Sequence, residues 1–273
     1  MLVPITTQLV TDTNAMLPAV LLDRYGILEV PLTIVIDGIP YGEHQVDLAE
    51  FYCHLRNETP LSTAAPSPGE VLATYKRAIQ AGATTILSIH VGSNQSATVN
   101  AARLAAAETD IPVRVVDTGT ASFMEGCCVW RAAEVLADGG DIDAAATAAE
   151  AVGRSARSVF TIGEITRALQ GGRLQVDDGP DVPVFASAGP DMREIARVTS
   201  QEAAIETMTT LIGAAAGPLR AGIGHADADA AADALEAAIG GLPEVAETIR
   251  YLVGPSMATH TGAGTFGAVF HQI

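Results

Sequence analysis

Residues 86–107 read ILSIHVGSNQSATVNAARLAAA, and this stretch indicates the fold of the first half of the chain. It opens with Ile86–Val91, a short and mainly apolar run that predicts a strand. Gly92 frees the backbone for a turn, Ser93 and Asn94 are good helix N-caps, and an alanine-rich helix follows. A strand that leads through such a turn into a helix N-terminus forms an anion site, because the first helical amides are unpaired there. The alternative is that Ser93 only caps its own helix.

Strand and helix patterns alternate through the first half. Strands are expected at residues 9–11, 28–36, 86–91 and 113–116, and helices at 15–25, 47–55, 67–81, 93–107, 123–137 and 141–152. Ser67-Pro68-Gly69-Glu70 is a capping box with proline at the first helical position, so a helix begins at Ser67 and Thr63 lies on an ordered loop before it. The alternation predicts an α/β domain with a doubly wound parallel sheet, whose ligands bind beyond the carboxyl ends of the strands.

The second half has a different pattern. Strands are expected at residues 158–162, 182–187, 194–198, 220–224 and 248–253 and after residue 264, with helices at 201–212 and 227–239. This order predicts an α+β domain with a mixed or antiparallel sheet. We therefore expect two domains, a Rossmann-like α/β domain over residues 1–153 and an α+β domain over residues 154–273.

Composition excludes several classes of protein. The chain has 273 residues, 48% of them hydrophobic, and a mean hydropathy of +0.28, which excludes disorder as its main state. Its net charge of −17 argues against a nucleic-acid partner. No apolar run reaches membrane-spanning length and no cationic segment opens the chain, so we expect a cytoplasmic protein without an integral membrane segment. Three cysteines without metal-ligand spacing are expected to be reduced thiols.

Candidate polar residues lie at strand ends and near the C-terminus. Asp12 and Asp117 each end a predicted strand, where they either line the ligand cleft or cap the next helix. His260 precedes Gly262 and Gly264, so it is either a functional group beside close-packed backbone or a structural histidine. The glycines match a dinucleotide fingerprint literally, but only six residues follow Gly267, too few for the required helix and strand.

Motifs of known catalytic machinery are missing from the sequence. It has no Gly-x-Ser-x-Gly nucleophile elbow, no Walker A lysine and no histidine spacing typical of a metal site. An acyl hydrolase or transferase with Ser93 as nucleophile and His260 as base stays open as an alternative function. A lipid-responsive regulatory module is a third possibility.

A set of short motifs, in order along the whole chain, resembles the DegV family, whose members bind fatty acids. The motifs are Val10–Thr13, Val30–Leu32, Thr63–Glu70, Gly92–Thr98, Val116–Thr118, Gly171–Arg173 and His260–Gly264. The resemblance implies two domains with one acyl chain buried between them. It also implies that the fatty acid carboxylate is held by Thr63, Ser93 and His260.

The resemblance further implies a non-catalytic carrier that needs no cofactor or metal and presents its long-chain fatty acid to a separate fatty acid kinase subunit. Arg173 is the residue we expect to contact that kinase. Further pocket or supporting residues are expected to be Asp12, Thr13, Ser96, Asp117, Thr118 and Gly262. The chain departs from the family pattern at Ala64 and Ala65, in a shortened segment over residues 175–183, and at Thr199, where the family has arginine.

Overall fold

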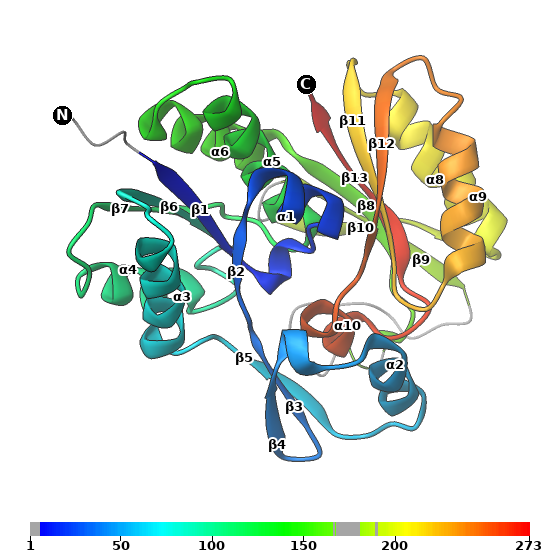
Figure 1. The fold of residues 1–273 in the computed structure, drawn as a ribbon. Helices are drawn as coiled ribbons and strands as arrows, with labels where there is room; N and C mark the ends of the chain where they lie inside the picture. The colour runs from blue at the N-terminus through cyan, green and yellow to red at the C-terminus, as the bar shows by residue number, and fades with distance from the viewer. Residues whose placement is uncertain (1–5, 166, 168–180, 189–190) are drawn as a thin grey trace. The chain divides into compact units, whose positions relative to one another are not determined.

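The structure is a computed structural model that describes residues 6–165, 167, 181–188 and 191–273 (Figure 1). The chain divides into two compact units, and each is described by itself. Unit 1 comprises residues 1–34, 40–44 and 63–154, and unit 2 comprises residues 35–39, 45–62 and 155–273. Unit 2 thus takes in two segments from the first half of the sequence as well as the second half.

Unit 1 is built on a parallel sheet with the strand order β2-β1-β6-β7. The strands are β1 (Thr7–Asp12), β2 (Leu28–Val30), β6 (Thr85–His90) and β7 (Val113–Asp117). Helices α3 (Pro68–Gln80) and α4 (Thr98–Ala106) pack on one face, and α5 (Phe123–Ala137) packs on the other (Figure 1). Helices α1 (Ala19–Tyr25) and α6 (Ile142–Ser155) complete the unit. The predicted α/β class with a parallel sheet is confirmed.

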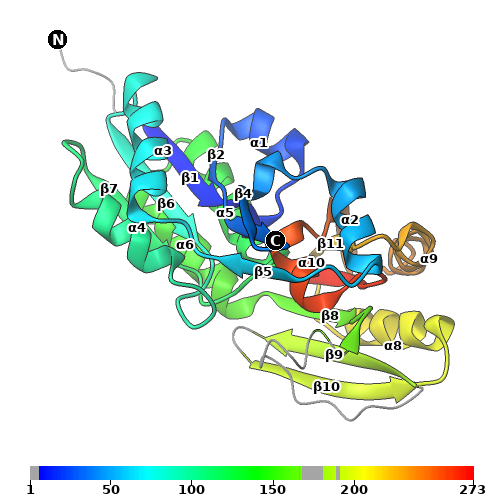
Figure 2. The same cartoon turned by 90° about the horizontal axis from the view of Figure 1, so that it is seen from below.

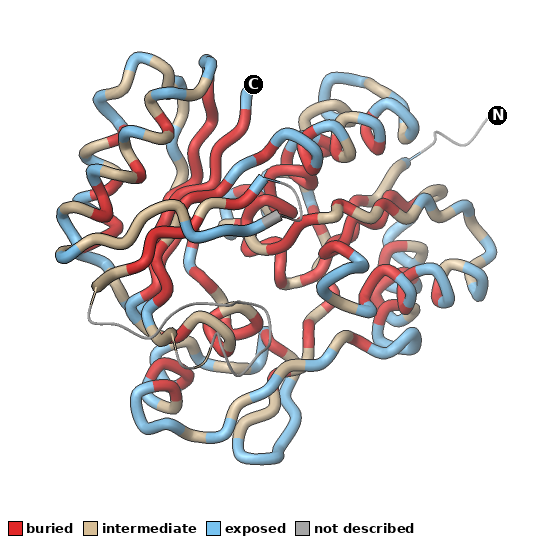
Figure 3. Tube along the Cα trace, turned by 180° about the vertical axis from the view of Figure 1, so that it is seen from behind, coloured by how far each residue is buried: buried red, intermediate tan, exposed pale blue. Residues whose placement is uncertain are grey.

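Unit 2 is built on a six-stranded sheet with the order β10-β9-β8-β13-β11-β12. Its strands are β8 (Arg157–Thr161), β9 (Val182–Ala188), β10 (Asp191–Val198), β11 (Leu219–His225), β12 (Val245–Leu252) and β13 (Phe266–Gln272). Only the β11–β12 pair is parallel among these neighbours, so the predicted mixed sheet is confirmed. Every residue of β11 is buried, as expected for a central strand (Figure 3).

Two helices bury the apolar core of unit 2 against one face of this sheet. They are α8 (Gln201–Gly213), which packs on β9 and β10 (Figure 2), and α9 (Asp229–Ile239), which packs on β11 and α8. Met208 and Leu235 from these helices share a core cluster with Ile223 of β11. The unit also contains α2 (Leu48–Arg56) and the short α10 (Pro255–Thr261).

A third, three-stranded sheet has the order β4-β3-β5. It consists of β3 (Thr33–Ile36), β4 (Ile39–Gly42) and β5 (Leu61–Ala64). Asp37 and Gly38 join the first two strands with positive φ angles of 49° and 80°, and an Asp-Gly pair is typical of such a tight turn. Pro40 lies on the edge strand β4, the kind of position to which proline is confined in sheets.

Prolines account for two errors in the predicted elements. The first helix begins at Ala19 and not near Ala15. Leu17 precedes Pro18, and a residue before proline disfavours the helical conformation, so a helix cannot run from Ala15 through this point. The strand predicted over residues 28–36 is two strands, interrupted at Pro31. The Leu32 N–H is donated to Thr13 Oγ1 (3.0 Å).

Two further elements differ from prediction, and α10 was not predicted at all. Thr63 lies in β5 and not in a loop, because its segment pairs with β3. The helix after β6 begins at Thr98, and neither Ser93 nor Asn94 caps it. Residues 93–96 form a turn instead, in which the N–H groups of Gln95 and Ser96 donate to Gly92 O.

The capping box of α3 provides a direct test of local stability. Ser67 Oγ accepts the Glu70 N–H (3.3 Å), and Glu70 Oε2 accepts the Ser67 N–H (2.7 Å). We expect Ser67→Ala to lower the free energy of unfolding by about 1 kcal/mol, because an N–H at the helix start loses its acceptor. Urea unfolding measures this change. The exposed Ser62→Ala is the control and should change it by less than about 0.5 kcal/mol.

Candidate functional site

The candidate site residue Ser93 follows β6 on a loop that is held by the strands on either side. Three successive N–H groups of this loop donate to unit 1: Val91 to Asp12 Oδ2 (3.2 Å), Gly92 to Thr120 O (2.7 Å) and Ser93 to Asp117 Oδ1 (3.1 Å). These amides are therefore used within the protein. The helix N-terminus that was predicted at Ser93 lies at Thr98, so the donor that Ser93 itself offers to a ligand is its exposed hydroxyl.

Asp117 lies at the end of β7 and accepts several hydrogen bonds from this loop. Its Oδ1 atom accepts the N–H groups of Ser93 and Gly119, each at 3.1 Å. Burial raises the pKa of Asp117. Hydrogen bonds from the Ser93 hydroxyl and from the backbone of Ser93 and Gly119 lower it, as does the charge of Arg103. The net result is a pKa below the usual value of an aspartate. Asp117 is therefore an anion that orients the Ser93 side chain.

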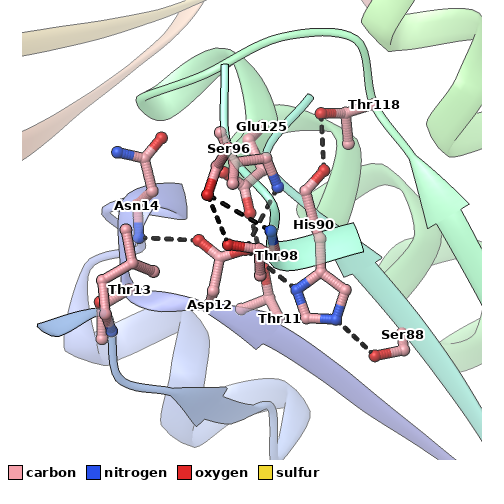
Figure 4. A network of polar contacts seen from close by, with 12 residues as sticks. Thr11, Asp12, Thr13, Asn14, Ser88, His90, Ser96, Thr98, Thr118 and Glu125 are labelled. Atoms are coloured by element: carbon pink, nitrogen blue, oxygen red, sulfur yellow. Dashed lines mark hydrogen bonds and ion pairs between the residues drawn. The ribbon is translucent and has the colours of Figure 1, made fainter. Parts of the chain in front are cut away.

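Asp12, at the end of β1, lies at the centre of a buried polar network (Figure 4). Its Oδ1 atom accepts the Asn14 N–H (3.0 Å), so it caps the short helical turn at residues 13–15, as one of the two predicted roles requires. Its Oδ2 atom lies 2.9 Å from His90 Nδ1, and both side chains are fully buried. His90 Nε2 lies 2.7 Å from Ser88 Oγ, which accepts a hydrogen bond from Tyr75 OH (2.8 Å).

This Ser-His-Asp order resembles a catalytic triad, but its burial excludes contact with a substrate. Ser88, His90 and Asp12 each have 0% exposure. Ser88 and His90 belong to none of the candidate sites that the sequence motifs predict. Their signal is the placement of two polar residues two positions apart in an apolar strand, which puts both side chains on one face of the sheet.

Two glutamates near the same strands, the buried Glu125 and the half-buried Glu29, have raised pKa values. Burial, and then the charge of Asp12, raise the pKa of Glu125 well above its usual value, while Thr11 Oγ1 donates to Glu125 Oε1 (3.2 Å). Burial and the charges of Glu43 and Asp12 raise the pKa of Glu29 to about 7. Burial therefore favours the protonated form of both glutamates relative to an exposed glutamate.

The remaining predicted supporting residues of unit 1 make hydrogen bonds within the protein. Thr13 Oγ1 donates to Glu43 Oε2, Thr118 Oγ1 donates to His90 O (2.9 Å), and Ser96 Oγ lies 2.8 Å from Thr98 Oγ1. These side chains hold the ends of β1, β6 and β7. Arg173, the predicted kinase contact, lies outside the described residues.

His260 is a half-buried residue in the last turn of α10. Pro255 opens this helix, and Gly262, with φ 78°, ends it. A Cβ atom on Gly262 would lie 2.4 Å from Glu164 Cβ, so the glycine allows the chain to pass close to the segment after β8. The close backbone approach that the glycines predicted is therefore present.

The loop after His260 is fixed by the hydroxyl of Thr265. Thr265 Oγ1 lies 2.9 Å from both Thr261 O and Gly262 O, and it accepts the Gly163 N–H (3.0 Å). The Gly264 N–H donates to Ala226 O (2.7 Å). These bonds define the path of the backbone that follows the imidazole.

The three predicted carboxylate-binding residues are distributed over both units. Thr63, half-buried on β5, and Ser93 belong to unit 1, and His260 belongs to unit 2. Within the described part of the chain, no group of three or more His, Cys, Asp or Glu side chains could hold a metal ion. No helix among the described residues is long and apolar enough to cross a membrane.

Comparisons with known proteins identify the family. A family model described as "uncharacterised protein, DegV family" matches residues 6–272. DegV domain-containing proteins of Streptomyces coelicolor and Mycobacterium tuberculosis are 32% and 31% identical to the chain, each alignment covering 96% of both proteins.

Solved structures agree with this match over nearly the whole chain. A DegV family protein from Thermus thermophilus, described by its fatty acid binding, has a TM-score of 0.87 and 28% identity, covering 98% of this chain and 99% of that one. A DegV lipid-binding protein from Thermotoga maritima has a TM-score of 0.91 at 24% identity, with 98% of each chain covered, and shows the same fold. The chain belongs to the DegV family.

Proposed function

We propose that this protein binds one long-chain fatty acid without transforming it and presents the bound acid to a fatty acid kinase. The observation that supports this most directly is the likeness to the fatty-acid-binding Thermus thermophilus protein, at 28% identity over 98% of the chain. The ligand is the substrate of the partner enzyme, and this chain is its carrier.

The proposed head-group site consists of Thr63, Ser93 and His260. Two hydroxyls and an imidazole can donate hydrogen bonds to a carboxylate and compensate for its desolvation. The Ser93 N–H is already bound to Asp117, so the serine would use its hydroxyl, which turns from Asp117 to the ligand. A chain of net charge −17 can bind a carboxylate in this way without a lysine or arginine at the site.

The acyl chain would provide most of the affinity. Each buried methylene contributes roughly 0.8 kcal/mol, so a long chain outweighs the contribution of the polar contacts. The head-group contacts would then fix the orientation of the acid, which a carrier needs if a second enzyme is to act on the carboxylate.

Native mass spectrometry of the freshly purified protein, followed by organic extraction and fatty acid analysis, tests the binding proposal. A stoichiometric co-purifying acid would support it and identify the chain length. A protein that is empty and also refuses added palmitate would contradict it. Presentation is tested separately by adding a fatty acid kinase and ATP to the loaded protein and measuring acyl phosphate.

The head-group assignment predicts the effect of three substitutions. Thr63→Ala, Ser93→Ala and His260→Ala should each weaken palmitate binding roughly 10- to 100-fold, because a hydrogen bond to a charged group contributes about 1.5–3 kcal/mol. Isothermal titration calorimetry measures the affinity, and thermal unfolding checks that each variant is folded. The exposed neighbours Ser62→Ala and Asn94→Ala are matched controls and should bind as the wild type does. Unchanged binding in all three variants would contradict the assignment.

A further inference from the structure

The Ser93 loop receives support from two carboxylates that flank β6. The sheet order β1-β6-β7 places Asp12 on one side of this strand and Asp117 on the other. Asp12 accepts the N–H of Val91, and Asp117 accepts the N–H of Ser93. Asp117 is a loop neighbour of the proposed site, whereas Asp12 is fully buried and contacts the loop through the Val91 amide.

The buried network runs from the loop to the far side of β6. Asp12 Oδ2 lies 2.9 Å from His90 Nδ1, and His90 Nε2 lies 2.7 Å from Ser88 Oγ. Tyr75 OH donates to Ser88 Oγ (2.8 Å) at the end of the network away from the loop. The His90 ring is therefore held through both of its nitrogen atoms, with Asp12 on the side of the loop.

This arrangement holds the Asp12 carboxylate in a single orientation. Its Oδ2 atom accepts from both His90 Nδ1 and the Val91 amide, and its Oδ1 atom accepts from the Asn14 amide. Figure 4 shows the carboxylate of Asp12 between Asn14 and the His90 ring. His90 thus supports the carboxylate that fixes the amide two residues before Ser93.

We infer that Asp12 and His90 are positioning residues for the proposed head-group site, because their buried pair sets the backbone path from β6 to Ser93. Only the expected change in lipid affinity rests on the proposed function. The effect of the Asp12–His90 pair on the loop can be measured without any lipid.

The test compares variants at the two ends of the network. Asp12→Asn keeps the shape of the side chain but removes its charge and one of its two acceptor atoms. Tyr75→Phe removes the hydroxyl that bonds Ser88, at the end of the network away from the loop, and serves as the matched control. Deuterium exchange of a peptide covering residues 89–97 reports on the loop, and calorimetry with palmitate reports on the site.

We expect Asp12→Asn to accelerate exchange in residues 89–97 at least 10-fold and to raise the palmitate Kd at least 10-fold. In Tyr75→Phe both quantities should stay within 2-fold of the wild type, even if its melting temperature falls. Equal acceleration of exchange in the two variants would overturn the inference, because the loop would then report only general loss of stability.

A second pair of variants decides the question if Asp12→Asn does not fold. His90→Asn retains an amide donor near the position of Nδ1, whereas His90→Leu has none. Slow loop exchange in His90→Asn with fast exchange in His90→Leu supports the inference, and equal exchange in both overturns it. If wild-type protein binds no palmitate, the proposed function fails while the exchange data still decide the role of Asp12 and His90.

Discussion

Replacing Gly163 with alanine is expected to destabilise unit 2 by about 3 kcal/mol and to weaken the proposed binding of a fatty acid. A Cβ atom at this position would lie 1.8 Å from Ala263 O and 2.7 Å from Thr265 N. Both contacts are with backbone, so no side-chain rotation can relieve them. The loop between Gly262 and Thr265 would have to move, and with it the end of the helix that carries His260.

Urea unfolding measures the stability change in Gly163→Ala, and fatty acid analysis of the purified variant measures retention. Gly241→Ala is the control in the same unit, because nothing lies within 4 Å of a Cβ atom built there. It should retain the lipid and change stability by less than about 0.5 kcal/mol. A Gly163→Ala variant as stable as this control would show that the loop tolerates the displacement.

The second large effect is a loss of stability as pH rises from about 4.5 to 7, caused by Glu29. Burial, with the charges of Glu43 and Asp12, raises the pKa of Glu29 from 4.5 to about 7. Between these values the folded state binds more protons than the unfolded state, so the free energy of unfolding decreases with rising pH. The contribution is fully present below pH 4.5 and is lost above pH 7. Its size is on the order of 3 kcal/mol.

Glu29→Gln isolates this contribution because glutamine is neutral at every pH. The variant and the wild type should be similarly stable at pH 4.5, and at pH 8 the variant should be more stable. The charge of Glu29 is also one of the causes that raise the pKa of Glu125, so its removal in Glu29→Gln favours the variant at high pH through Glu125 as well. Parallel curves of unfolding free energy against pH would contradict the role of Glu29.

Elements with strong local signals could be predicted from the sequence. The helix over residues 123–137 matches its predicted bounds, and the capping box at Ser67 forms as the pattern requires. The turn at Asp37-Gly38 has an equally local cause, because both residues tolerate the positive φ angles that the turn demands. These features depend on neighbours in sequence.

Features that depend on distant partners could not be predicted. Thr63 is in a strand because its segment pairs with β3. Helix α10 has only seven residues and no side-chain cap, so its local signal is weak. The polar network joins Asp12 to His90 across 78 positions of sequence, and only the adjacency of β1 and β6 brings the two together. The roles of Thr63, Ser93 and His260 stay predictions.

The inclusion of residues 45–62 in unit 2 has a consequence for synthesis on the ribosome. The buried face of α2 includes Phe51 and Leu55, and Tyr52 OH bonds Val253 O, which is 201 residues further along the chain. At a synthesis rate of roughly 5–20 residues per second, Val253 is synthesised about 10–40 s after Tyr52. During this time the apolar face of α2 is available to chaperones. A fragment that begins at residue 155 would lack α2. Dividing the chain at one position therefore cannot yield the two units as separate, complete fragments.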